Sequence, residues 1–283
     1  MLGPDRTCPS REGTPIMSDT VLYDVDAGLA TITINRPEAM NAMDRATKVA
    51  LRDALSAAAA DTAVRGVLLT GSGDRAFCVG QDLKEHTALL EAARRDGTGD
   101  AMSTVREHYN PILRAITEMA KPVVAGVNGV AAGAGLGFAL AADHRVVADT
   151  ASFNTSFAGV ALTADSGVSW TLPRLVGHGR ATDLLLFPRS VPAAEAHAWG
   201  LVDRVVPAAE LAAEARAVAR ALASGPTLAL AALKESLAYG AGHSLAETLV
   251  KEDELQSRAG MSEDHAIAVA AFLAKEKPRY VGR

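Results

Sequence analysis

Two glycine-rich turns, each placed after a short apolar run, are the segments of this chain best suited to chemistry. RAFCVGQDLK (75–84) follows the run RGVLLTG (65–71), and NGVAAGAGLG (128–137) follows KPVVAGV (121–127). Backbone N–H groups are unpaired at the start of a helix, and small side chains let a ligand oxygen approach them. Two such N–H groups, one from each turn, could bind the negatively charged oxygen of an enolate, an arrangement called an oxyanion hole.

Simpler interpretations of the second turn exist. Gly133, Gly135 and Gly137 approach the dinucleotide-binding pattern GxGxxG, but its last glycine would fall on Phe138. A glycine-rich turn can also serve only to pack a helix closely against a strand. The acids and bases that directly follow the first turn favour the oxyanion interpretation.

The elements that carry these turns alternate along the chain. LATITIN (29–35) alternates in polarity and is rich in β-branched residues, which is typical of a strand. Residues 44–61 place apolar residues on one face of a helix. Residues 85–100 are polar and are expected to form a mobile loop, and a helix is expected to follow through about Met119.

The order of these elements indicates the fold class and the organisation of the chain. Three apolar runs are each closed by a glycine turn, which predicts a layered α/β arrangement with the turns gathered at one end. From Pro207 onward the apolar spacing predicts four helices. We therefore expect a disordered tail over residues 1–17, an α/β core over 18–206 and a helical region over 207–283.

Composition excludes several classes of function. The chain of 283 residues has 28 Lys and Arg against 33 Asp and Glu and carries no basic block, which argues against a nucleic-acid partner. Charged residues interrupt every apolar run, so no membrane span is expected. Two cysteines suit a cytoplasmic protein without a disulfide framework. The first residues lack the apolar core of a signal peptide, and Met17 is an alternative start.

Several segments, taken in order, resemble one known family. They are FCVGQDLK, NGVAAGAG, ADSGVSWTLPRLVG and AEAHAWGLVDRVV, with NRPEAMNAM before them and AAFLAKEKPRYVGR at the end. The chain over about residues 20–283 is similar to the crotonase family, also called the enoyl-CoA hydratase/isomerase family. This resemblance implies a spiral of ββα units over 18–206 and a C-terminal helical trimerisation region. It also implies an acyl-CoA thioester substrate, a homotrimer or a hexamer built as a dimer of trimers, and neither a metal nor a redox cofactor.

The resemblance assigns roles to particular positions. The backbone N–H groups of Gln81 and Ala134 fall where the family forms its oxyanion hole. The two glutamates that hold water in hydratases of the family fall on Gly137 and Phe157, neither of which can activate water. Asp165 falls where isomerase branches place a catalytic aspartate. The closest likeness is to the phenylacetate-pathway isomerase branch, although Ala164 replaces the proline usual before this Asp.

These assignments predict an enoyl-CoA isomerase in which Asp165 is the acid and base. Two other functions stay open: an enoyl-CoA hydratase of fatty-acid oxidation, and a non-catalytic protein that binds acyl-CoA. Asp165 itself has a structural alternative, because an Asp before Ser-Gly can cap the following helix or hold an Asx-turn.

Further positions are expected to bind CoA or the acyl group by the same resemblance. Each basic residue among them could equally be an ordinary solvated charge. The positions are Ala42, Arg75, Val79, Asp82, Leu83, Lys84, Gly133, Phe157, Phe272 and Lys275.

Other conspicuous residues have structural interpretations. Asp143 and Arg145 are expected to pair and close a helix. His86, beside the first turn, could touch the acyl group but is expected to be solvated in a loop. Trp170 is expected to form a pocket wall or part of the core, and Cys78 to be a small packing residue. Asp82, despite its place in the turn, is expected to act as a helix cap or turn clamp.

Overall fold

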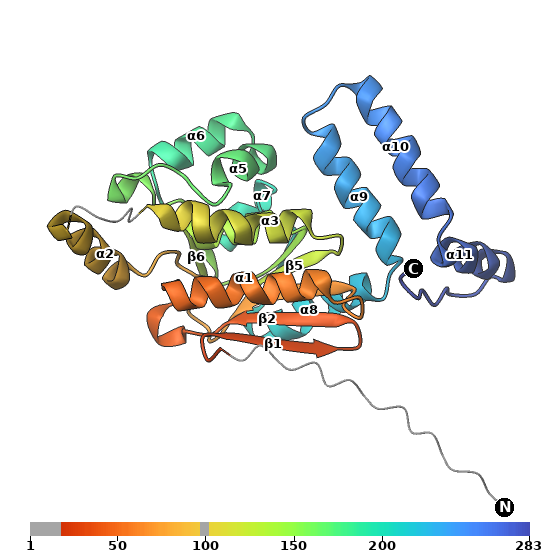
Figure 1. The fold of residues 1–283 in the computed structure, drawn as a ribbon, viewed down its shortest axis with the longest axis horizontal. Coiled ribbons are helices and arrows are strands. Elements are labelled where there is room, and N and C mark those ends of the chain that lie inside the picture. The colour runs from red at the N-terminus through yellow and green to blue at the C-terminus, as the bar shows by residue number, and fades with distance from the viewer. Residues whose placement is uncertain (1–17, 97–101) are drawn as a thin grey trace, which may run out of the picture.

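Two sheets form the centre of the molecule in the computed structural model, which describes residues 18–96 and 102–283 (Figure 1). The expected tail over 1–17 lies outside the described residues. The larger sheet has the order β1-β2-β3-β5-β7-β10. β1 and β2 are antiparallel and the other pairs are parallel. Its strands are β1 (Val21–Asp26), β2 (Leu29–Ile34), β3 (Gly66–Gly71), β5 (Val123–Val127), β7 (His144–Ala148) and β10 (Arg204–Val206).

Three strands of the smaller sheet each follow a strand of the larger sheet along the chain. It has the order β4-β6-β8-β9, in which β4, β6 and β8 are parallel and β9 pairs antiparallel with β8. β3 is followed by β4, β5 by β6 and β7 by β8, so one strand pair after another winds through both sheets. This repeat is the expected spiral α/β fold. The strands are β4 (Ala76–Cys78), β6 (Val130–Ala132), β8 (Ser152–Asn154) and β9 (Val191–Pro192).

Helices pack against the sheets through apolar faces, and the spacing of these faces is the one predicted from the sequence. α1 (Arg45–Ala60) begins where Asp44 caps it by accepting a hydrogen bond from the Thr47 N–H at 2.8 Å, and it buries the predicted apolar face. α1 packs against α3 (Asn110–Glu118), and α8 (Leu211–Ala223) packs against β3 and β5. α4 (Ala134–Ala141) is buried on every side, which explains why all its residues are small or apolar.

Residues 85–96 of the segment expected to be a mobile loop belong to a helix instead, and residues 97–100 lie outside the described residues. α2 (Leu83–Asp96) begins at the first glycine turn, where Asp82 Oδ1 accepts hydrogen bonds from the N–H groups of Lys84 (3.0 Å) and Glu85 (3.4 Å). Its side chains are mostly half-buried or exposed, so its composition is polar, like that of a loop. The next expected helix is confirmed: a π-helical turn, Val105–Tyr109, leads into α3, which ends at Glu118.

Three C-terminal helices project away from the sheets (Figure 1). They are α9 (Thr227–Gly240), α10 (Leu245–Gly260) and α11 (Glu263–Ala274), which with α8 make the four predicted helices. None of the helices over 18–96 and 102–283 has the length and apolar character needed to cross a membrane. The remaining helical elements are α5 (Val168–Val176), α6 (His178–Leu186), α7 (Ala193–Ala198) and the 3-10 turns Pro37–Ala39, Ala158–Val160 and Ala208–Glu210.

The pairing expected between Asp143 and Arg145 is wrong. Arg145 is buried and binds Asp203 at 2.7 Å, whereas Asp143 binds the Lys234 ammonium of α9 at 2.8 Å. Lys234 also donates to the Ile116 carbonyl at 2.7 Å, so it ties α9 to the core. The sequence suggested a pair between charges two residues apart, but each of them binds a charged residue from a distant part of the chain instead.

The projecting helices leave large apolar side chains in solvent, which predicts self-association. Leu233 and Leu237 on α9 are 61% and 78% exposed, and others lie on α10 and α11. We expect light scattering to give a mass three or six times that of one chain. Replacing Leu233 and Leu237 with Glu should lower that mass, whereas Leu22→Glu, at an exposed apolar position on β1, should not. A monomeric wild-type protein at micromolar concentration would contradict this prediction.

Candidate active site

A cavity of about 810 Å³ opens beside the two glycine turns. It brings together all the predicted site residues except Arg75, Phe272 and Lys275. The predicted residues that line it are Ala42, Val79, Gln81, Asp82, Leu83, Lys84, Gly133, Ala134, Phe157 and Asp165.

The two turns touch through bare backbone. β4 and β6, which carry them, pair side by side. Gly80 has a φ of +83°, and a Cβ on it would lie 3.1 Å from the Ala134 nitrogen. A Cβ on Gly135 would lie 2.6 Å from the Cys78 carbonyl carbon, closer than any real contact. Glycine is therefore required at both places, by backbone conformation at Gly80 and by close approach at Gly135.

Each turn presents one N–H group without a partner. Met43 bonds to both neighbours of Gln81: its N–H donates to the Gly80 carbonyl at 2.7 Å, and its carbonyl accepts from the Asp82 N–H at 3.1 Å. The Gln81 N–H points away from this pairing and has no acceptor within residues 18–96 and 102–283. Ala134 is the first residue of α4, and its N–H likewise has no acceptor in that part of the chain. Both residues line the cavity, so a ligand oxygen there could accept both hydrogen bonds.

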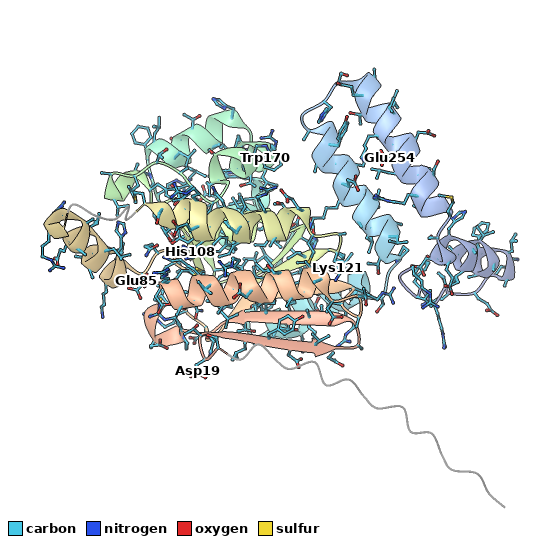
Figure 2. All side chains as sticks on the ribbon, viewed as in Figure 1. Asp19, Glu85, His108, Lys121, Trp170 and Glu254 are labelled. Atoms are coloured by element: carbon cyan, nitrogen blue, oxygen red, sulfur yellow. The ribbon has the colours of Figure 1, made fainter. Side chains whose placement is uncertain are left out.

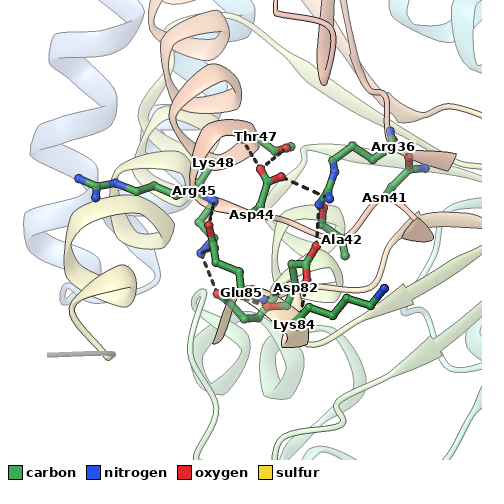
Figure 3. Close-up of polar contacts among 12 residues, drawn as sticks. Arg36, Asn41, Ala42, Asp44, Arg45, Thr47, Lys48, Asp82, Lys84 and Glu85 are labelled. Carbon is green, nitrogen blue, oxygen red and sulfur yellow. Dashed lines mark hydrogen bonds and ion pairs between the residues drawn. The ribbon is translucent and has the colours of Figure 1, made fainter. Parts of the chain in front are cut away.

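The loop before α1 forms another wall of the cavity and fixes the first turn (Figure 3). The Arg36 guanidinium donates to Asp82 Oδ2 at 3.0 Å and to the Ala42 carbonyl at 2.7 Å, and lies 3.3 Å from Asp44. Burial opposes ionisation of Asp82, but hydrogen bonds from Arg36 and from the start of α2 outweigh it and lower the pKa of this carboxyl. Asp82 is thus ionised, holds the first turn through its contact with Arg36 and caps α2, as predicted from the sequence.

Asp165 lies in the cavity wall with a free carboxylate oxygen. Its Oδ1 is buried and has no hydrogen-bond partner in the described chain. The residue at the cap position of α5 is Gly167, and no side chain makes a capping bond there, so the helix-cap interpretation of Asp165 is wrong. Burial raises the pKa of the Asp165 carboxyl above its ordinary value. A carboxylate of this kind is suited to taking up and returning a proton.

Neither position of the two missing hydratase glutamates carries an acid, and position 137 has no room for one. A Cβ on Gly137 would lie 2.6 Å from the Ser166 Cβ and nearer still to the Ser166 carbonyl oxygen, so no side chain fits there. Ser166 and Gly167 both have left-handed backbone, with φ of +48° and +69°, and this turn places Asp165 beside α4. Phe157, at the other position, is a buried wall of the cavity.

Comparison with known proteins identifies the family. The family model described as Enoyl-CoA hydratase/isomerase matches residues 24–283. The chain belongs to the enoyl-CoA hydratase/isomerase family. Two of its similar relatives carry different activities in their names. A "Probable enoyl-CoA hydratase" of Rhodobacter capsulatus is 42% identical over 93% of this chain and 98% of the relative. The 1,2-epoxyphenylacetyl-CoA isomerase of Escherichia coli is 37% identical over 94% of this chain and all of the relative.

Solved structures of the family agree with the fold. A crystal structure of an enoyl-CoA hydratase/isomerase family protein from Mycobacterium abscessus superposes with a TM-score of 0.88. It is 49% identical and covers 93% of this chain and all of that protein. Enoyl-CoA hydratase from Bacillus anthracis gives a TM-score of 0.85 at 31% identity, with 93% of this chain and all of that protein covered.

Three residues that the family resemblance assigned to CoA do not line this cavity. Arg75 is exposed outside it. Phe272 is 81% exposed on α11, and Lys275 ends that helix. Figure 1 shows α11 and α2, which contributes to the cavity wall, at opposite ends of the molecule. Phe272 and Lys275 therefore lie too far from the cavity of their own chain to contribute to it. Their contribution to the CoA site of a neighbouring subunit stays a prediction.

Two structural interpretations need correction, and one is confirmed. Trp170 is 49% exposed and stacks on Arg174 at 4.0 Å, so it forms neither pocket wall nor core. His86 lies on α2 and lines the cavity rather than lying in a solvated loop, and its buried Nδ1 has no hydrogen-bond partner within residues 18–96 and 102–283. Cys78 is fully buried, and burial raises the pKa of its thiol to about 12, as suits a packing residue.

Sequence reasoning missed a polar group beside Gln81. Lys48 is 1% exposed, and its ammonium donates to Gln81 Oε1 at 2.8 Å. Tyr109, which lines the cavity, donates its hydroxyl to the same oxygen at 2.6 Å. One signal could have found Lys48: it lies three residues before Leu51 and seven before Leu55, on the buried face of α1.

We predict that Gly137 tolerates no larger residue. Gly137→Ala should lower the free energy of unfolding by about 1–3 kcal/mol, because the new methyl group would press on the Ser166 backbone. Gly137→Glu should lose more stability without gaining hydratase activity. Gly179→Ala is the matched control: nothing lies within 4 Å of its added Cβ in α6, so its melting temperature should stay equal or rise. Equal melting temperatures for wild type and Gly137→Ala would contradict the crowding argument.

Proposed function

We propose that this protein is an enoyl-CoA isomerase that works through a CoA enolate. The observation that carries the proposal is the half-buried carboxylate of Asp165, whose buried Oδ1 has no hydrogen-bond partner in the described part of the chain. It lies in a cavity that is also lined by Gln81 and Ala134, whose N–H groups have no acceptor among the same residues. Those N–H groups would bind the thioester oxygen, and Asp165 would move the proton. The family membership and the isomerase name of the E. coli relative support this assignment.

Each step of the proposed reaction moves a proton and an electron pair. The ionised Asp165 takes a proton from a carbon of the acyl chain, and the released electrons form an enolate whose oxygen is held by Gln81 and Ala134. Protonated Asp165 then returns the proton to a different carbon, and the double bond shifts. Nothing is oxidised or reduced overall, so the proposal requires no redox cofactor. Burial of the carboxyl raises its pKa, which makes the ionised form a stronger base toward the acyl chain.

The cavity walls suggest the kind of acyl group. Met102, Val105, Phe157, Val160 and Leu162 form an apolar lining, whereas the rim carries Lys84. The Lys84 ammonium extends away from the clamp of Figure 3, which leaves it available to a phosphate of CoA. We therefore propose an apolar acyl chain or ring as the substrate, and the epoxyphenylacetyl thioester named for the E. coli relative belongs in the first panel tested.

We predict that hydration of crotonyl-CoA is at least about 100-fold slower than isomerisation of the best substrate, because no acid stands at position 137 or 157 to activate water. Absorbance of the conjugated enoyl thioester measures both reactions when combined with product analysis, because hydration of crotonyl-CoA lowers it and a shift of the double bond into conjugation raises it. A hydration rate that matched isomerisation would move the assignment to an enoyl-CoA hydratase, the activity named for the R. capsulatus relative. Binding of acyl-CoA without any turnover would instead support a non-catalytic protein.

Asp165→Asn is the decisive substitution. Asn keeps the size of Asp but takes no proton, so isomerase activity should fall about 100- to 10,000-fold, while the melting temperature and CoA affinity stay near the wild-type values. Asp149→Asn is the matched control. Asp149 does not line the cavity, and it accepts a hydrogen bond from the Ala208 N–H at 3.0 Å that Asn can still accept. Wild-type activity in Asp165→Asn would end the proposed role of Asp165.

A further inference from the structure

The buried ammonium of Lys48 has no part in the chemistry proposed so far. Lys48 comes from the first turn of α1 and is among the largest fully buried side chains. Besides Gln81, its ammonium donates to Thr104 Oγ1 at 3.0 Å and lies 3.6 Å from Glu85 Oε2 (Figure 3 shows Lys48 and Glu85 together). Burying an ammonium costs free energy that an apolar side chain of similar length would avoid. Packing alone therefore does not account for a lysine here.

Two side chains from different elements donate hydrogen bonds to the same atom of Gln81, its Oε1. Lys48 reaches its Oε1 from α1, and Tyr109 reaches the same oxygen from the π-helical turn before α3. The Tyr109 ring packs edge-on against Phe138 of α4, with ring centroids 6.0 Å apart, and the Lys48 ammonium lies 5.4 Å from the Tyr109 ring. Tyr109 is itself buried, so neither donor can swing into water. These contacts leave the Gln81 side chain one orientation.

The backbone of Gln81 is held independently. Met43 bonds to the Gly80 carbonyl and to the Asp82 N–H, one on each side of Gln81. Together, the Met43 bridge and the grip on Oε1 fix the peptide whose N–H faces the cavity. A hydrogen-bond donor contributes most to an oxyanion when it is already aimed before the charge develops, and small misplacements are costly.

We propose that Lys48 and Tyr109 are positioning residues that aim the Gln81 N–H at the substrate oxygen. This inference rests on the proposed role of Gln81 as an oxyanion donor. Both residues act through the Gln81 side chain. Removing Lys48 should therefore weaken the stabilisation of the enolate more than it weakens substrate binding.

Lys48→Met tests the proposal, with Lys121→Met as the matched control. Lys121 is also buried, and its ammonium donates to the Ala58, Ala59 and Asp61 carbonyls at the far end of α1. Figure 2 places Lys121 at the opposite end of α1 from Glu85 and His108. Lys48→Met should lower kcat about 10- to 100-fold and change KM by less than about 3-fold. Lys121→Met should lose stability but keep the wild-type kcat for its folded fraction.

A spectroscopic measurement separates this inference from the proposed function. Butyryl-CoA labelled with ¹³C at the thioester carbonyl cannot isomerise, and its infrared carbonyl stretch falls when hydrogen bonds polarise it. The wild type and Lys121→Met should lower the stretch equally, and Lys48→Met should lower it less. If the wild type binds the thioester and shifts its stretch but isomerises nothing, the proposed function fails while the positioning role can still be judged. An unchanged shift and an unchanged kcat in Lys48→Met would overturn the positioning role.

Tyr109→Phe keeps the proposal testable if Lys48→Met does not fold. Phe retains the ring that packs on Phe138 and removes only the hydroxyl that donates to Gln81. We expect kcat to fall about 3- to 10-fold, with a smaller carbonyl shift and a KM close to that of the wild type. A folded Tyr109→Phe protein with the wild-type shift and kcat would show that the grip on Gln81 positions nothing.

Discussion

Contact between two bare backbones is the constraint on which the site depends. Gly80 and Gly135 let the two turns meet so closely that the nitrogen of Ala134 lies just beyond where a Cβ on Gly80 would stand. The parallel pairing of β4 with β6 brings the turns together, and the larger sheet delivers the chain to each of them. A side chain at either glycine would separate the turns, and with them the N–H groups of Gln81 and Ala134, which have no acceptor among the described residues.

Desolvation shifts the pKa values of two charged groups near this contact in opposite directions. It raises the pKa of Asp165, the carboxyl in the cavity wall, and lowers the pKa of Lys48, the ammonium behind Gln81. The two residues come from different elements, Asp165 from the turn before α5, whose Ser166 has a positive φ, and Lys48 from α1. The middle of each turn supplies main-chain dipoles. The groups that could move a proton or hold charge are Asp82 and Lys84 at the end of the first turn and side chains of the helices and loops packed around the turns.

Local patterns predicted the elements whose burial is regular. The alternation in β2, the apolar face of α1 and the spacing of α8 to α11 all appear in the structure. α2 escaped prediction because its side chains are largely solvated, so it has no strong apolar stripe and depends on the Asp82 cap.

The candidate site was predictable only in part, for a different reason. The turns and Asp165 were predicted from motifs, and their positions around the cavity agree with that prediction. Lys48 and Tyr109 lie 33 and 28 residues from Gln81 in the chain, and nothing in a single sequence shows that they converge on one oxygen. Asp143 and Arg145 illustrate the reverse error, since adjacent charges suggested a pair that more distant partners replace.

The fit of Gly137 against Ser166 also limits how a protein of this shape can change its chemistry. The space that a side chain at 137 would need is filled by the backbone that presents Asp165. A single substitution therefore cannot add a second acid there while keeping the first. A change of activity during evolution would require replacement of the whole segment before α5 together with the residue at position 137 of α4. A protein with only the new residue would be overcrowded there, and one with only the new segment would contain a cavity. Engineers who wish to graft water chemistry onto this scaffold face the same coupled step.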